Sequence, residues 1–213
     1  LTVVQCKVFS RPLRLRSSLV RAGGLTPPPG DDSFGPMSGE GKKLQYEQGE
    51  GSLRLGPLRY MLVRPETLTE IQKGVEDRLG PKSAEYLYAA GASWAMGALR
   101  RLAAALAEDP ESIAHAFCRH TTKLGWGRFE LQSVDSNGRK LAVQVTSSPL
   151  AEAYGSSDLP VCHLFAGVVG GLAEWLFKMP TSCNEQMCAA RGEPACLFVA
   201  EGHDVAGTDK WEW

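Results

Sequence analysis

Residues 183–198 read CNEQMCAARGEPACLF and contain three of the six cysteines of the chain. The Gly-Glu-Pro at residues 192–194 predicts a turn between two strands, so that Cys196 would return beside Cys188. Glu185 and Cys188 lie three positions apart on the first strand, where strict alternation would send their side chains to opposite faces. A bulge, or the start of the turn, must therefore bring both side chains to one side.

A cysteine further upstream can close a metal site with these residues. Cys162 lies at the first turn of a helix predicted over about residues 159–178, and the positive end of a helix dipole favours a thiolate. Zinc in proteins takes four ligands in a tetrahedron; thiolate is its preferred soft donor, and carboxylate is acceptable. A closed set of four ligands leaves no open position, so such a metal ion would be structural and not catalytic.

The spacing by itself leaves other interpretations of these cysteines open. Free cysteine is among the most buried residue types, so the thiols could be unrelated members of the core. Cys183 and His163 are competing metal ligands. The spacing gives an iron–sulfur cluster little support, because such a cluster would need four thiolates in tighter runs.

Outside this region the chain changes from helical to strand periodicity. Helical spacing and end signals predict helices over residues 65–79 and about 83–108, and a third helix that begins after Asp109. Alternating apolar residues on both sides of Asn137-Gly138 predict a hairpin. Together with the last hairpin, these elements predict an α+β domain in which a mostly antiparallel sheet packs against a helical block.

The composition limits the class of protein and partner. The chain has 213 residues, of which 43% are hydrophobic and 22% charged, and its formal net charge is -1. These values are ordinary for a globular protein and do not indicate nucleic acid or an anionic membrane as a partner. No apolar run reaches the roughly 18 residues that would predict a transmembrane segment.

The distribution of residues along the chain predicts its organisation. We expect a disordered, basic and Pro/Gly-rich tail over residues 1–50 and a folded domain with the metal site over residues 51–213. The cysteines are clustered and no signal peptide is visible, so we expect a reducing, cytoplasmic location.

The ligand spacing is one of two specific features that the chain shares with a known family. The other is the RYMLVRPETL of residues 59–68, and the CAARGEPACLF of residues 188–198 fits as well. Over about residues 51–202 the chain resembles the V4R (4-vinyl reductase) domain family, whose phenol-sensing members carry the same ligand types at this spacing. The resemblance implies a structural zinc ion with four ligands, which are Cys162, Glu185, Cys188 and Cys196. It also implies an α+β fold similar to the Bet3-like trafficking subunits, a homodimer, and a buried pocket for a small hydrophobic ligand.

Within this family, a single-domain chain of this size is most similar to the members that act in bacteriochlorophyll biosynthesis, which are named for reduction of a vinyl group of divinyl (proto)chlorophyllide. No G-x-G-x-x-G follows a strand, and the GVVGG of residues 167–171 is more simply a small-residue packing face within a helix. No flavin or ferredoxin-type motif is visible either. We therefore expect a protein that binds a tetrapyrrole pigment precursor for a separate partner reductase, and we assign no catalytic residue. The alternative is a stand-alone zinc-containing sensor of small aromatic ligands that regulates a partner protein.

The candidate residues for the ligand pocket are large side chains that could offer flat apolar walls to a ring system. They are Tyr86, Trp94, Met96, Phe117, Trp126 and Trp175. The alternative is that most of them simply fill the core. His115, His120 and His163 could ligate the magnesium of a chlorin, but a single histidine is more often structural or exposed, so none is selected.

Overall fold

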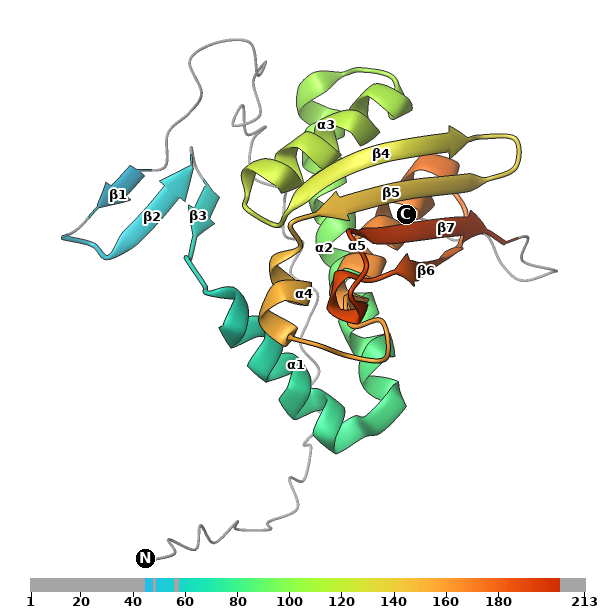
Figure 1. Ribbon diagram of the computed structural model, residues 1–213. Helices are drawn as coiled ribbons and strands as arrows, with labels where there is room; N and C mark the ends of the chain where they lie inside the picture. The colour runs from blue at the N-terminus through green and yellow to red at the C-terminus, as the bar shows by residue number, and fades with distance from the viewer. Residues whose placement is uncertain (1–44, 48, 56–57, 204–213) are drawn as a thin grey trace, which may run out of the picture. The chain divides into compact units, whose positions relative to one another are not determined.

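The computed structural model describes residues 45–47, 49–55 and 58–203 (Figure 1). The first described elements are three short strands that pair in sequence order as an antiparallel sheet. They are β1 (Gln45–Glu47), β2 (Ser52–Leu55) and β3 (Leu58–Tyr60). The tail expected over residues 1–50 lies outside the described residues as far as residue 44. Strand β1 falls in the remainder of that range, so paired structure begins before the expected boundary at residue 51.

Four long helices form the helical block that the sequence predicts. They are α1 (Pro65–Leu79), α2 (Ser83–Leu106), α3 (Pro110–Lys123) and α5 (His163–Phe177). The side chain of Asp109 caps α3, because its Oδ1 accepts hydrogen bonds from the backbone N–H groups of Glu111 and Ser112, both at 3.0 Å. The predicted start of the last helix near residue 159 is wrong: residues 155–162 are irregular, and α5 begins at His163.

The structure contains a short helix that the sequence does not predict, α4 (Pro149–Tyr154). Along the chain it follows the hairpin of Asn137-Gly138 and precedes Cys162. Ser148 Oγ accepts a hydrogen bond from the backbone N–H of Ala151 at 3.3 Å, and Pro149 occupies the first helical position. Tyr154 Oη donates to Glu76 Oε2 at 2.7 Å, which joins α4 to α1.

The main sheet has four strands in the order β4-β5-β7-β6, and every neighbouring pair is antiparallel. Its members are β4 (Arg128–Asp135), β5 (Lys140–Thr146), β6 (Thr181–Met187) and β7 (Cys196–Gly202). Asp135 Oδ1 closes the first hairpin, accepting hydrogen bonds from the backbone N–H groups of Asn137 at 3.1 Å and Gly138 at 2.8 Å. The predicted α+β fold with a mostly antiparallel sheet is confirmed.

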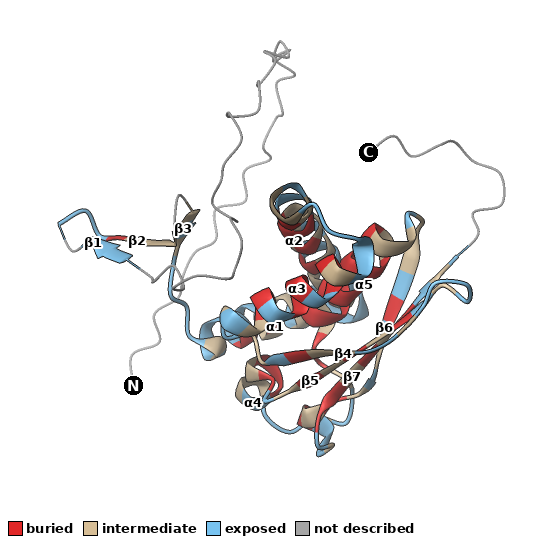
Figure 2. Ribbon diagram, turned by 90° about the horizontal axis from the view of Figure 1, so that it is seen from above, coloured by how far each residue is buried: buried red, intermediate tan, exposed pale blue. Residues whose placement is uncertain are grey.

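The core lies between one face of this sheet and helices α2, α3 and α5 (Figure 2). Leu141, Val143 and Val145 alternate along β5 with less buried residues and are fully buried, as period-2 patterning requires. Among the described residues, no helix is long and apolar enough to cross a membrane. The expected cytoplasmic location stays a prediction.

Helices α2 and α5 approach each other through glycines. A Cβ atom at Gly91 would clash with the carbonyl oxygen of Leu164, and one at Gly167 would clash with the carbonyl oxygen of Tyr88. The close approach lets Leu99 of α2 and Leu172 of α5 lie fully buried in the same core. The small-residue packing face predicted for residues 167–171 is therefore present.

Candidate metal centre

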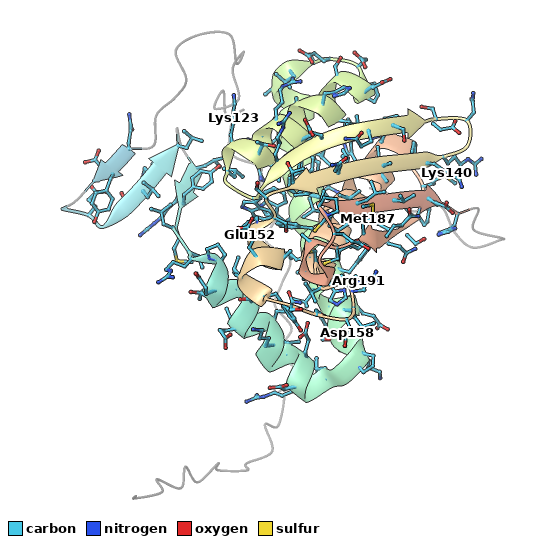
Figure 3. All side chains as sticks on the ribbon, viewed as in Figure 1. Lys123, Lys140, Glu152, Asp158, Met187 and Arg191 are labelled. Carbon is cyan, nitrogen blue, oxygen red and sulfur yellow. The ribbon has the colours of Figure 1, made fainter. Side chains whose placement is uncertain are left out.

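The four predicted metal ligands come from three places in the chain. Cys162 immediately precedes α5, Glu185 lies on β6, Cys188 follows the end of β6, and Cys196 is the first residue of β7. In Figure 3 the labelled Met187 and Arg191 lie on the segment around Cys188.

The expected bulge is present in the last hairpin. Glu185 pairs with Phe198, but Met187 pairs with Leu197, so the register shifts by one residue between them. This extra residue changes the alternation of side chains along β6. Glu185 and Cys188 consequently reach the same side of the hairpin, as the spacing of the ligands requires.

The four side chains converge in a buried cluster. Their ligand atoms all lie within 4.8 Å of one another, and Cys162 Sγ is 3.8 Å from Cys196 Sγ. All three cysteines have 0% relative exposure, and Glu185 is partly buried. Within the described part of the chain, this group of three thiols and one carboxyl could hold a metal ion.

Hydrogen bonds around the cluster orient the ligands. Glu185 Oε2 accepts from the backbone N–H of Cys162 at 2.9 Å, whereas Glu185 Oε1 is buried and has no hydrogen-bond partner among the described residues. The backbone N–H of Ala189 donates to Cys196 Sγ at 3.4 Å. A buried carboxylate oxygen without a partner is costly, so an oxygen free to bind a cation fits the donor set.

Residues outside the four ligands hold the segments that carry them. The backbone N–H of Cys188 donates to Glu193 Oε2 across the hairpin turn. On the other side, Gln72 of α1 donates from Nε2 to the carbonyl oxygen of Val161 at 2.8 Å, one residue before Cys162. Sequence reasoning treated Glu193 as a turn residue only and did not single out Gln72. An acid between two cysteines could have indicated the role of Glu193, but nothing local in the sequence indicates that of Gln72.

Burial and mutual hydrogen bonds shift the pKa values of the four groups in different directions. Burial raises the pKa of the Glu185 carboxyl to about 9. Hydrogen bonding to Cys188 and Cys196 raises the pKa of the Cys162 thiol far above its usual range. The same bonds from Cys162 lower the pKa of Cys188 to about 5 and that of Cys196 to about 7. Without a bound ion, these interactions favour protons on Cys162 and Glu185 and a thiolate at Cys188.

The two competing ligands lie outside the four-residue group. Cys183 is on β6, two residues before Glu185, and burial raises the pKa of its thiol to about 12. His163 is the first residue of α5, and burial lowers the pKa of its imidazole. Neither belongs to the set of ligand atoms that lie within reach of a single ion.

Only part of the predicted ligand-pocket set comes together. Trp94 stacks on Trp126 with ring centroids 4.3 Å apart and lies 5.8 Å from Phe117, and Trp126 stacks on Phe165 at 5.8 Å. We call these four residues the aromatic cluster. Of the remaining candidates, Tyr86 is 63% exposed, Met96 packs against the core, and Trp175 is buried with Lys178 Nζ 4.2 Å from its ring centroid.

The comparison with protein families supports the predicted resemblance. Residues 141–202 match the family model of the V4R domain, and this segment contains all four residues of the candidate metal centre. Over 87 residues the chain is 36% identical to the bacteriochlorophyll synthase 23 kDa chain of Cereibacter sphaeroides, and the matched region covers 40% of each chain. The chain thus spans about two fifths of the length of this relative.

One solved structure is similar in fold, and a second gives a lower score. The phenol-responsive sensory domain of the transcription activator PoxR, solved with phenol, superimposes with a TM-score of 0.65 at 20% identity, covering 75% of this chain and 84% of that one. A trafficking protein particle complex subunit 3 from Naegleria fowleri, covalently bound to palmitic acid, gives a TM-score of 0.49 at 11% identity, covering 68% of this chain and 98% of that one.

Proposed function

We propose that this chain is a zinc-stabilised binding protein of bacteriochlorophyll biosynthesis, which holds a tetrapyrrole pigment precursor for a separate reductase. The observation that carries the biosynthetic role is its 36% identity over 87 residues to the bacteriochlorophyll synthase 23 kDa chain. The match of residues 141–202 to the V4R family model supports the proposal, and this segment contains the four candidate metal ligands.

Zinc is the metal that the donor set favours. Three thiols and one carboxyl form a closed set of four, and thiolate-rich tetrahedral sites are typical of structural zinc. Zinc–sulfur bonds of about 2.3 Å in a tetrahedron separate two thiolate sulfurs by about 3.8 Å. Cys162 Sγ and Cys196 Sγ are 3.8 Å apart. The metal would join the last hairpin to the start of α5 and, with all four positions filled, would not take part in chemistry.

Zinc binding at neutral pH is expected to release between about two and three protons per ion, because the metal takes deprotonated ligands. Cys162 and Glu185 must each lose a proton, Cys196 loses part of one, and Cys188, with a pKa of about 5, is already a thiolate. Titration calorimetry in buffers of different ionisation enthalpy measures this number, and zinc affinity should fall as the pH is lowered. Release of fewer than about one proton would contradict the assigned ligands.

The ligand-binding part of the proposal draws on the aromatic cluster. Trp94 and Trp126 are only partly buried, so their rings can contribute flat apolar surface to a macrocycle. Phe117 and Phe165 are buried behind them and fix their positions. The reducing equivalents would come from the partner reductase.

Titration of the purified protein with divinyl protochlorophyllide, followed by absorbance, tests the proposed function. We expect binding in the micromolar range and no turnover when NADPH alone is added. Trp126→Leu should weaken pigment binding by about tenfold, because it removes one wall of the cluster. Tyr86→Leu, which alters an exposed candidate outside the cluster, should bind as the wild type does. Absence of pigment binding at micromolar concentration would refute the proposal.

The runner-up function is a sensor of small aromatic ligands. The similarity in fold to the phenol-responsive domain of PoxR supports it, with a TM-score of 0.65. The same titration with phenol in place of the pigment separates the two. Micromolar binding of phenol without binding of the pigment would favour the sensor.

We also propose that the chain forms a homodimer through helix α1. Helix α1 buries Thr69 and Gln72 and exposes apolar side chains, among which Ile71 has 59% relative exposure. An amphipathic helix that turns apolar residues outward indicates a protein partner. Ile71→Asp is expected to convert the dimer to a monomer in light scattering after size-exclusion chromatography. Leu159→Asp, which changes a 71% exposed residue outside α1, should stay dimeric. A monomeric wild type, or a dimeric Ile71→Asp, would contradict the assignment.

A further inference from the structure

A groove between α3 and the edge strand β4 lies apart from the metal centre. It has a volume of about 480 Å³, and both elements supply its walls. Its lining residues are His115, Cys118, Arg119, Thr122, Lys123, Arg128, Phe129, Glu130 and Leu131. None of them is a predicted ligand-pocket residue, and the volume is in the usual range for small-molecule sites.

The rim of the groove carries an excess of positive charge. Arg119 and Lys123 occupy successive turns of α3, are exposed, and form no ion pair with any described residue. Glu130 already pairs with Arg128, whose Nη2 is 2.6 Å from Glu130 Oε1. Lys123 lies in the last turn of α3, where the negative end of the helix dipole favours a cation. Arg119 lies one turn earlier, beyond the reach of this dipole effect. The guanidinium of Arg119 and the ammonium of Lys123 are thus available to an anion.

A buried aromatic side chain lies beneath the groove and packs against the aromatic cluster. Phe129 lines the groove and makes an edge-on contact with Phe165 at 5.3 Å. Thr122 fixes the position of Phe129, because the Oγ1 of Thr122 accepts from the backbone N–H of Phe129 at 3.0 Å and donates to the carbonyl oxygen of Cys118 at 2.9 Å. An apolar surface next to unpaired cations suits a ligand with a flat apolar body and an ionised carboxylate.

The geometry points to this groove as the site for the carboxylate-bearing edge of the ligand, with Arg119 and Lys123 as its anion-binding residues. The inference rests on the proposed function, since tetrapyrrole precursors carry ionised propionate side chains. Leu131, which is only partly buried, contacts the apolar edge of the ring system, and the carboxylate pairs with the guanidinium of Arg119 and the ammonium of Lys123. Arg119 can hold a carboxylate through two parallel N–H groups, which would fix the orientation of the ring.

A pair of probes that differ only in charge tests the site. Protoporphyrin IX has two ionised propionates, and its dimethyl ester has none. Binding of each to the full chain is followed by quenching of tryptophan fluorescence. We expect the diacid to bind about tenfold more tightly than the diester, and the preference to weaken at high salt. The double variant Arg119→Gln/Lys123→Gln should lose the preference by binding the diacid more weakly while keeping the diester affinity.

A matched double variant controls for net charge. Lys82→Gln/Lys140→Gln removes the same charge from exposed positions outside the groove, and Figure 3 shows Lys140 at the other end of the sheet from Lys123. This variant should keep the preference for the diacid. Equal binding of both probes by the wild type, or a preference retained by Arg119→Gln/Lys123→Gln, would overturn the groove while leaving pigment binding intact. Failure of the wild type to bind either probe would instead refute the proposed function and the groove with it.

Discussion

Replacement of Cys188 by serine is expected to release the zinc ion and to lower the free energy of unfolding by at least about 3 kcal/mol. A structural zinc ion contributes binding free energy on the order of 10 kcal/mol to small zinc domains, and that energy supports the folded state alone. Cys188 is fully buried and belongs to the four-residue group, so a serine there removes one of three thiolates from a site closed to water. Elemental analysis and urea unfolding measure the two effects.

The neighbouring Cys183→Ser is the matched control for this prediction. Cys183 is also a buried thiol of the same hairpin, but its sulfur lies outside the four-residue group. This variant should keep about one zinc per chain and lose only about 1 kcal/mol, the cost of burying a hydroxyl in place of a thiol. Loss of metal from Cys183→Ser, together with metal retained in Cys188→Ser, would show that the wrong thiol is assigned.

The substitution Gly167→Ala is expected to lower the free energy of unfolding by about 3 kcal/mol, near the upper end of the usual cost of overpacking. The new methyl group would meet the backbone carbonyl of Tyr88, and backbone atoms cannot move aside as a flexible side chain can. Helices α2 and α5 would have to separate, which would disturb the core between them. The midpoint of urea unfolding measures the loss.

A glycine on α2 provides the control for this packing prediction. A Cβ atom at Gly97 would meet only the terminal Nη1 of Arg101, at 3.5 Å. Gly97→Ala should therefore leave stability unchanged or raise it by up to about 1 kcal/mol, because alanine is the better helix former. Equal unfolding midpoints for Gly167→Ala and the wild type would contradict the close approach of α2 and α5.

Much of the fold can be predicted because its signals are local. Asp109 caps α3 through its own side chain, and Asp135 closes the hairpin whose tip the sequence marks with Asn137-Gly138. The missed helix α4 carries the same kind of signal in Ser148-Pro149. The start of α5 cannot be read from apolar spacing, because the apolar residues before His163 belong to an irregular segment and not to a helical turn.

The arrangement of the candidate metal centre could be predicted only in part. The spacing of Glu185 and Cys188 requires a bulge, and the register shift supplies it. The choice of Cys162 over Cys183 depends on how α5 packs against the hairpin, which involves contacts between residues far apart in sequence. The pocket candidates show the same limit: helical spacing does not distinguish the exposed Tyr86 from the partly buried Trp94 on the same helix.

X-ray absorption at the zinc edge, on protein purified without added metal, tests the central claim most directly. We expect about one zinc ion per chain, with three sulfur ligands at about 2.3 Å and one oxygen ligand at about 2.0–2.2 Å. This shell corresponds to Cys162, Glu185, Cys188 and Cys196. An absence of zinc, or a shell of four sulfurs, would contradict the assignment of these residues as one closed zinc site.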